Sequence, residues 1–133
     1  MNALAAAALA AGELICEFSD GYRIELSLFF EALNKASAQV LSTHRPGRRE
    51  VQVHSTSDYL HLIQPEGPSV RVTTLTGCTR TRWRGDEEVC TRFAARHAWH
   101  FDTAAHLDPD ESFRRQPSGA ASGSCEPWRV EPY

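Results

Sequence analysis

Apolar and polar residues alternate along most of this chain, which is the pattern of strands that bury one face. The clearest run covers residues 22–32, and a shorter one covers residues 13–18. A helix would scatter these apolar residues around its circumference, whereas a sheet with one wet face separates them from the polar ones. The apolar face of the longer run consists of Tyr22, Ile24, Leu26, Leu28, Phe30 and Ala32.

Turn signals divide the chain into short strands. Ser19-Asp20-Gly21, Pro46-Gly47 and Pro65-Glu66-Gly67-Pro68 are combinations that stop a strand. Their spacing predicts an all-β protein, an antiparallel meander of about seven to eight strands that forms a small barrel or a rolled sheet. A β-sandwich is the alternative. Strands and helices do not alternate, so a parallel α/β fold is not expected.

Two segments carry mixed signals. Residues 89–101 alternate as a strand, but Val89 and Phe93 are also four residues apart, and Asp86 to Glu88 would suit the start of a helix over residues 87–97. We favour the strand because the alternation continues to Phe101. Gly77 is expected to mark a bulge in the run over residues 69–83.

The chain length of 133 residues suits a single domain, expected over residues 13–133. Residues 3–11 are only Ala and Leu, and Ala8-Leu9-Ala10 has the small-x-small form of a signal-peptidase site. We read residues 1–12 as the remnant of an export signal, with a disordered arm as the alternative. Residues 102–133 lose the alternation and are expected to form an extended, irregular C-terminal tail.

Cysteine spacing points to an oxidising compartment. Cys16, Cys78, Cys90 and Cys125 are widely separated and form no Cys-x-x-Cys unit, which suits disulfides better than zinc. Together with the leader-like start, this predicts a periplasmic or secreted protein. The alternative is four free thiols.

The pairing of the cysteines follows from the expected turn around Arg84. Cys78 and Cys90 lie at equal distances from it, so their side chains would oppose each other and form one disulfide. The same register places Leu75 opposite Phe93. By elimination, Cys16 pairs with Cys125 and ties the tail to the first strand, a long loop closure that contributes about 4 kcal/mol in the chain-entropy model.

Charge and composition exclude some classes of partner. The net charge is −3, so no global field favours nucleic acid, although arginines gather around residues 44–49 and 80–96. No stretch reaches the ~20 apolar residues of a transmembrane segment. Arg84-Gly85-Asp86 is read by some cell-adhesion receptors, but Gly-Asp is also ordinary turn chemistry, which we favour.

The sequence carries no strong catalytic or metal signature. Its six histidines form no obvious ligand set, and only His54 and His61 are expected to meet, across a turn. Neither a Gly-x-Ser-x-Gly elbow nor a phosphate-cradling glycine loop is present, and no cofactor or metal is expected. His97 and His100 remain candidates for an enzyme of unknown reaction.

These observations favour an exported β-barrel that binds a partner, either a protein or an envelope component, without catalysis. The first alternative is a carrier of a small apolar ligand held in the barrel, an analogy with lipocalin-like barrels that rests on the fold alone. The ligand cavity would then be lined by Phe18, Phe30, Phe93, Trp99 and Phe101. The second alternative is an enzyme.

Overall fold

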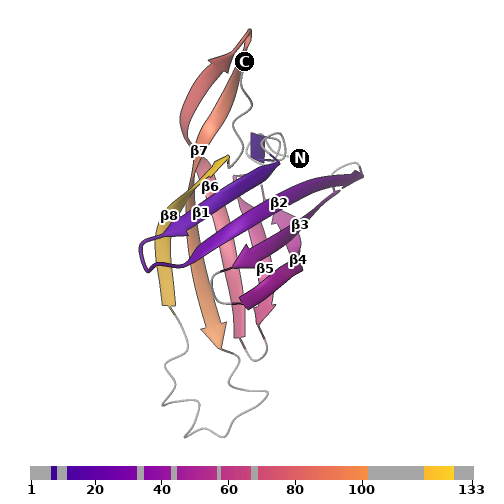
Figure 1. The fold of residues 1–133 in the computed structure, drawn as a ribbon, viewed down its shortest axis with the longest axis vertical. Coiled ribbons are helices and arrows are strands. Elements are labelled where there is room, and N and C mark those ends of the chain that lie inside the picture. The colour runs from indigo at the N-terminus through magenta and orange to yellow at the C-terminus, as the bar shows by residue number, and fades with distance from the viewer. Residues whose placement is uncertain are drawn as a thin grey trace, which may run out of the picture.

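Eight antiparallel strands form a closed barrel in which each strand pairs with the next along the chain and the last returns to the first (Figure 1). The structure, a computed structural model, describes residues 7–8, 12–32, 35–42, 45–56, 58–66, 69–101 and 119–127. The meander barrel predicted from the alternation is confirmed. The strands are β1 Glu13–Phe18, β2 Arg23–Ala32, β3 Lys35–Ser42, β4 Arg45–Ser55, β5 Leu60–Glu66, β6 Ser69–Arg84, β7 Glu87–Phe101 and β8 Gly119–Pro127.

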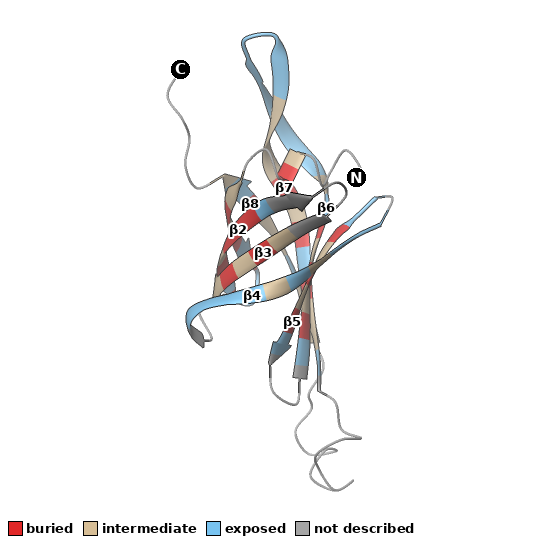
Figure 2. Ribbon diagram, turned by 90° about the vertical axis from the view of Figure 1, so that its right-hand side faces the viewer, coloured by how far each residue is buried: buried red, intermediate tan, exposed pale blue. Residues whose placement is uncertain are grey.

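The barrel interior holds the core. Buried apolar side chains on β1, β2 and their neighbours point inward at alternate positions, as the pattern predicts (Figure 2). Ala8, from the segment before β1, is fully buried against the same cluster. The core consists of Ala8, Leu14, Cys16, Phe18, Tyr22, Ile24, Leu26, Leu28, Ala38, Val40, Leu60, Leu62, Leu75, Phe93, Ala95 and Cys125.

Strand β8 corrects the expectation of an irregular tail over residues 102–133. Gly119–Pro127 pairs with β7 on one side and with β1 on the other, and so closes the barrel. The small residues of β8 show no alternation of apolar and polar positions. Small residues are nevertheless needed where β8 packs between β1 and β7. A Cβ at Gly119 would overlap the Trp99 ring, and one at Gly123 would collide with the Glu17 carbonyl. The remainder of the expected tail lies outside the described residues.

Two disulfides are present, with the pairing expected from the sequence. Cys16–Cys125 joins directly opposed residues of β1 and β8, and both cysteines are fully buried, so this bond closes the barrel seam covalently. Cys78–Cys90 joins β6 to β7. Two disulfides fit a protein of an oxidising compartment.

Strands β6 and β7 are longer than the barrel and project from one end as a two-stranded ribbon (Figure 1). We call residues 76–92 the arm, since β5 pairs with β6 only up to Leu75 and β8 pairs with β7 only from Phe93. The strand prediction for residues 87–97 is therefore confirmed, and the helix alternative is wrong.

The register of the arm differs from the expected one. The turn is Gly85-Asp86, with Gly85 at a φ of 61°, so Arg84 pairs with Glu87. Register shifts occur between Leu75 and Gly77, as predicted for Gly77, and also beside Arg80. In consequence, Cys90 lies opposite Thr81, Cys78 opposite Phe93 and Leu75 opposite Ala95. The expected register, with Cys78 facing Cys90 and Leu75 facing Phe93, is therefore wrong, although the disulfide itself forms as expected. The disulfide crosses the ribbon diagonally.

Candidate binding sites in the barrel and its arm

A cluster of polar side chains is buried in the half of the barrel away from the arm. Arg71, His97, Thr73 and Gln64 are each at least nine-tenths buried, and they point inward from β6, β7 and β5. The described residues contain no buried side-chain nitrogen or oxygen that lacks a hydrogen-bond partner. A closed network of this kind is the condition under which polar groups are tolerated inside a barrel.

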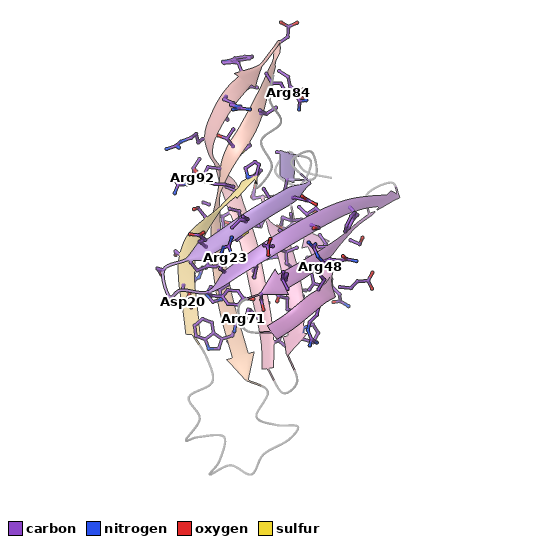
Figure 3. All side chains as sticks on the ribbon, in the orientation of Figure 1. Asp20, Arg23, Arg48, Arg71, Arg84 and Arg92 are labelled. Atoms are coloured by element: carbon purple, nitrogen blue, oxygen red, sulfur yellow. A yellow bond between two sulfur atoms is a disulfide. The ribbon has the colours of Figure 1, made fainter. Side chains whose placement is uncertain are left out.

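His97 connects two charged residues at the centre of this cluster. Nη1 of Arg71 donates to Nδ1 of His97 at 2.8 Å, and Nε2 of His97 lies 2.9 Å from Oδ2 of Asp20. A guanidinium can only donate, so Nδ1 accepts and carries no proton. The ring proton is therefore on Nε2, which donates to the Asp20 carboxylate. Figure 3 shows Asp20 and Arg71 at this end of the barrel.

Aromatic rings enclose the same histidine. The rings of Tyr22 and Trp99 stack on His97 at centroid distances of 4.6 and 5.1 Å, and Phe18 lies 4.5 Å away. Arg71 lies over the Tyr22 ring at 4.2 Å, a cation–π contact. Because both ring nitrogens are engaged and two rings stack on it, His97 is placed to hold this end of the barrel together.

Asp20 lies in the turn between β1 and β2, with its side chain one-third exposed. Burial raises the pKa of its carboxyl group. The backbone N–H of Tyr22 and the electrostatic interaction and hydrogen bond with His97 lower it by more, so the pKa of Asp20 lies below its ordinary value of 3.8. The carboxylate is thus the ionised acceptor that the His97 tautomer requires.

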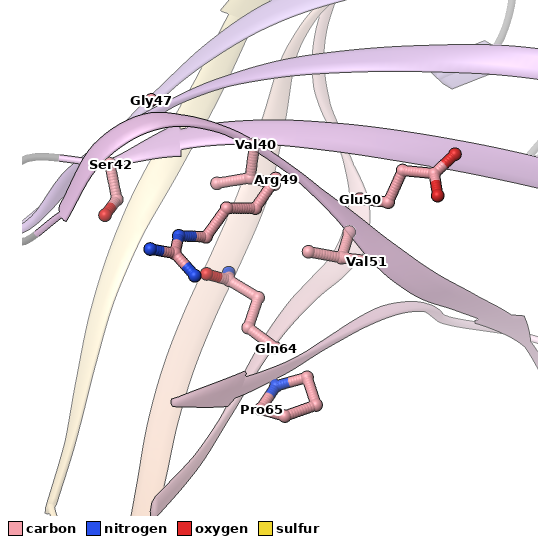
Figure 4. A pocket seen from close by; sticks show the side chains of 8 residues that line it. All are labelled: Val40, Ser42, Gly47, Arg49, Glu50, Val51, Gln64 and Pro65. Atoms are coloured by element: carbon pink, nitrogen blue, oxygen red, sulfur yellow. The ribbon is translucent and has the colours of Figure 1, made fainter. Parts of the chain in front are cut away.

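A pocket of about 230 Å³ opens through the barrel wall beside this cluster (Figure 4). In the described part of the chain, only Gln52–Ser55 of β4 pairs with β5, and its partner is Leu60–Ile63. The pocket lies where the two strands separate. We call it the β4–β5 pocket. It is lined by Val40, Ser42, Gly47, Arg49, Glu50, Val51, Gln64 and Pro65.

The arm presents a different surface, since its outer part is exposed on every side (Figure 2). Trp83 is 67% exposed, the highest value among the large exposed apolar residues of the described chain. Arg82 and Arg84 flank it in the sequence, and the pleat of the strand places them on the opposite face of the ribbon. Tryptophan and arginine are residue types that are enriched at protein interfaces.

His54 and His61 lie opposite each other on β4 and β5, as expected, with ring centroids 6.2 Å apart. Burial, and the positive charge that His54 can carry, lower the pKa of His61 below its ordinary value of 6.5. No group of three or more potential metal ligands occurs among the residues that the structure describes.

The aromatic residues proposed for a ligand cavity are spread over the barrel. Phe93 is fully buried in the core, Phe18 packs against His97, and Trp99 lies between His97 and Gly119. The side chains of Phe30 and Phe101 lie outside the described residues. None of these residues lines the β4–β5 pocket, so a cavity between them stays a prediction.

Sequence reasoning missed the inward arginine of β6. Val70 is exposed, whereas Arg71 and Thr73 are buried in phase with Leu75. The parity of Leu75 alone carried the correct signal. Hydropathy indicated the opposite face, because an arginine is expected to be exposed. A buried arginine is acceptable only when partners from other strands surround it.

Comparison with protein families, with curated proteins and with solved structures finds no match for this chain. In the part of the chain that the structure covers, no helix is long and apolar enough to cross a membrane. The candidate sites therefore have to be interpreted from their own geometry.

Proposed function

We propose that this protein is a non-catalytic binding module, periplasmic or secreted, that engages a protein partner through its arm. The arm is the observation that carries this proposal. A ribbon that extends beyond the barrel and is held by its own disulfide contributes little to the core, yet it is kept ordered. Preorganising a contact surface in this way reduces the entropy lost on binding.

The side chains of the arm support recognition by contact rather than by strand addition. Neither outer edge of the ribbon is paired among the described residues, so a partner strand would have to dock there. Register shifts beside Arg80 interrupt the β6 edge, and arginines follow along it. Both features discourage edge-to-edge pairing.

The chemistry of the arm indicates what kind of partner would fit. Trp83 offers a large exposed ring on one face, and Arg82 and Arg84 offer guanidinium groups on the other. Tryptophan and arginine are the residues most enriched among binding hot spots. A protein surface that combines an apolar pocket with carboxylates would complement both faces. An envelope component is the other class that the sequence leaves open.

The test compares one arm variant with one matched control. The wild-type protein, Trp83→Ala and Tyr59→Ala are immobilised and exposed to the exported proteins of the source, and any partner retained is purified and titrated by calorimetry. Tyr59 is a suitable control because it is also exposed, at 44%, but lies in the turn before β5.

We expect Trp83→Ala to weaken partner binding by roughly 30-fold or more, since truncating a hot-spot residue costs about 2 kcal/mol or more. Tyr59→Ala should bind as the wild type does. A partner that binds all three proteins equally would contradict a role for the arm. So would the absence of any partner whose retention depends on Trp83.

A further inference from the structure

The β4–β5 pocket contains a cation that the barrel does not need. Arg49 lies opposite Val40, an inward-facing residue, and Figure 4 shows its guanidinium directed into the pocket toward Gln64. No hydrogen bond or ion pair joins this guanidinium to any residue that the structure describes. Glu50, the one acidic residue of the lining, points away from it (Figure 4).

The remaining walls combine apolar surface with one fixed polar group. Val40, Val51 and Pro65 provide the apolar part. Gln64 is buried, with only 7% of its surface exposed. Its carboxamide oxygen accepts a hydrogen bond from the Tyr22 hydroxyl at 3.4 Å, and its carboxamide nitrogen donates one to the Thr73 hydroxyl at 3.5 Å. These bonds hold Gln64 in place, so the polar wall exists before any ligand arrives.

Volume and charge together restrict the ligand. A cavity of about 150 Å³ accommodates benzene, so the 230 Å³ of this pocket corresponds to on the order of ten non-hydrogen atoms. A single guanidinium matches a carboxylate, which it binds through two parallel hydrogen bonds. The apolar walls match a compact hydrocarbon body. A more highly charged anion would find a single cation in the lining and would lose hydration against the valines.

We infer that the β4–β5 pocket binds a small monocarboxylate with a compact apolar body, with Arg49 holding the carboxylate. The ligand differs from an apolar cargo inside the barrel, because recognition depends on charge at the wall. This site is separate from the arm, because Gln64 and Pro65 pair with Arg71 and Val70, near the start of β6, and the arm begins after Leu75 (Figure 1). The inference therefore does not depend on the proposed function of the arm.

Benzoate is a probe of suitable size, and benzamide is its neutral counterpart. Each is titrated into the full-length protein while amide and side-chain resonances are followed by NMR. The variants are Arg49→Gln and, as the matched control, Arg48→Gln. Arg48 is the neighbouring arginine on β4, and its guanidinium donates to Ser27 Oγ at 3.1 Å.

We expect benzoate to shift the Gln64 carboxamide and the Val40 and Val51 methyl resonances with saturation, and benzamide to bind at least tenfold more weakly. Arg49→Gln should weaken benzoate binding roughly ten- to a hundred-fold, the usual effect of losing a hydrogen-bonded charge partner, while Arg48→Gln leaves it unchanged. Trp83→Ala should also leave it unchanged.

Three results would overturn the inference. The first is no saturable shift of the pocket resonances with benzoate. The second is equal binding of benzoate and benzamide, which would assign the pocket to apolar ligands. The third is tighter binding of inorganic phosphate than of benzoate with the same dependence on Arg49, which would assign it to anions in general.

Discussion

The two disulfides should differ sharply in what they contribute to stability, because one closes the barrel and the other clasps the arm. The perturbation is a pair of double variants, Cys16→Ala/Cys125→Ala and Cys78→Ala/Cys90→Ala. The first removes a fully buried bond between directly opposed strands. The second removes a bond from a ribbon that projects beyond the barrel (Figure 1).

The magnitude follows from loop length and from the order of the native state. The bonds span 109 and 12 residues, for which the chain-entropy model gives about 5 and about 3 kcal/mol. That figure holds only if the loop stays equally ordered in the native protein without the bond. Strands β1 and β8 are paired on both edges, so the full value applies to Cys16–Cys125.

The arm responds differently because it can fray while the barrel remains folded. Its native state then gains entropy when Cys78–Cys90 is removed, and this gain offsets most of the entropy gained by the unfolded chain. We therefore expect a loss of about 4 to 5 kcal/mol in the free energy of unfolding for the seam pair. For the arm pair we expect less than about 1 kcal/mol.

Urea unfolding in non-reducing buffer, followed by tryptophan fluorescence and far-UV circular dichroism, measures both losses by linear extrapolation. Hydrogen exchange at the amides of residues 79–91 reports the fraying directly and should accelerate only in the arm variant. Equal losses for the two variants, or a larger one for the arm, would refute the reasoning. The arm would then belong to the cooperative unit of the barrel.

Three further predictions concern the barrel itself. Gly123→Ala should lower the unfolding free energy in urea by roughly 2 kcal/mol, because the added Cβ collides with the Glu17 carbonyl, whereas Gly77→Ala, which meets no atom within 4 Å, should change it little. His97→Ala should lower it by about 3 kcal/mol or more, since it leaves Arg71 buried without that acceptor; a loss below 1 kcal/mol would show that the cluster does not hold the barrel end. The pKa of Asp20 is lower in the folded protein, so its ionised carboxylate contributes stability that is fully present above pH 3.8 and is lost as the pH falls through the folded pKa. The wild type should therefore lose more unfolding free energy between pH 5 and pH 2 than Asp20→Asn does. Identical pH profiles for the two proteins would contradict this.

Much of the barrel wall was predictable because its strands alternate. In β1 and β2 the apolar face of the sequence pattern is buried from Leu14 to Leu28, and Ser27 of the polar face is buried with it. The bulge at Gly77 and the contact between His54 and His61 were also accessible, since both follow from local parity and turn position. These features depend on neighbours in the sequence and on the two-residue period of a strand.

The candidate sites were less predictable. Arg49 enters a pocket because β4 and β5 separate, and that separation is a property of the closed wall rather than of either strand. The arm required knowing that β6 and β7 extend past the last pairing of β5 and β8. Trp83 is a large apolar residue on a long strand, and its place beyond the barrel makes it a surface group.

The sequence by itself determined that this chain forms an antiparallel meander, because alternation and turn chemistry are local and act strand by strand. Tertiary structure decided where the barrel closes and what its interior tolerates. The segment Gly119–Pro127 forms strand β8 because β1 and β7 pair with it on both edges. Its glycines and serines alone do not favour a strand. Arg71 is buried because His97, on β7, and Tyr22, just before β2, reach it from other parts of the chain. Both outcomes depend on contacts between residues far apart in the chain, and hydropathy along one strand carries no record of them.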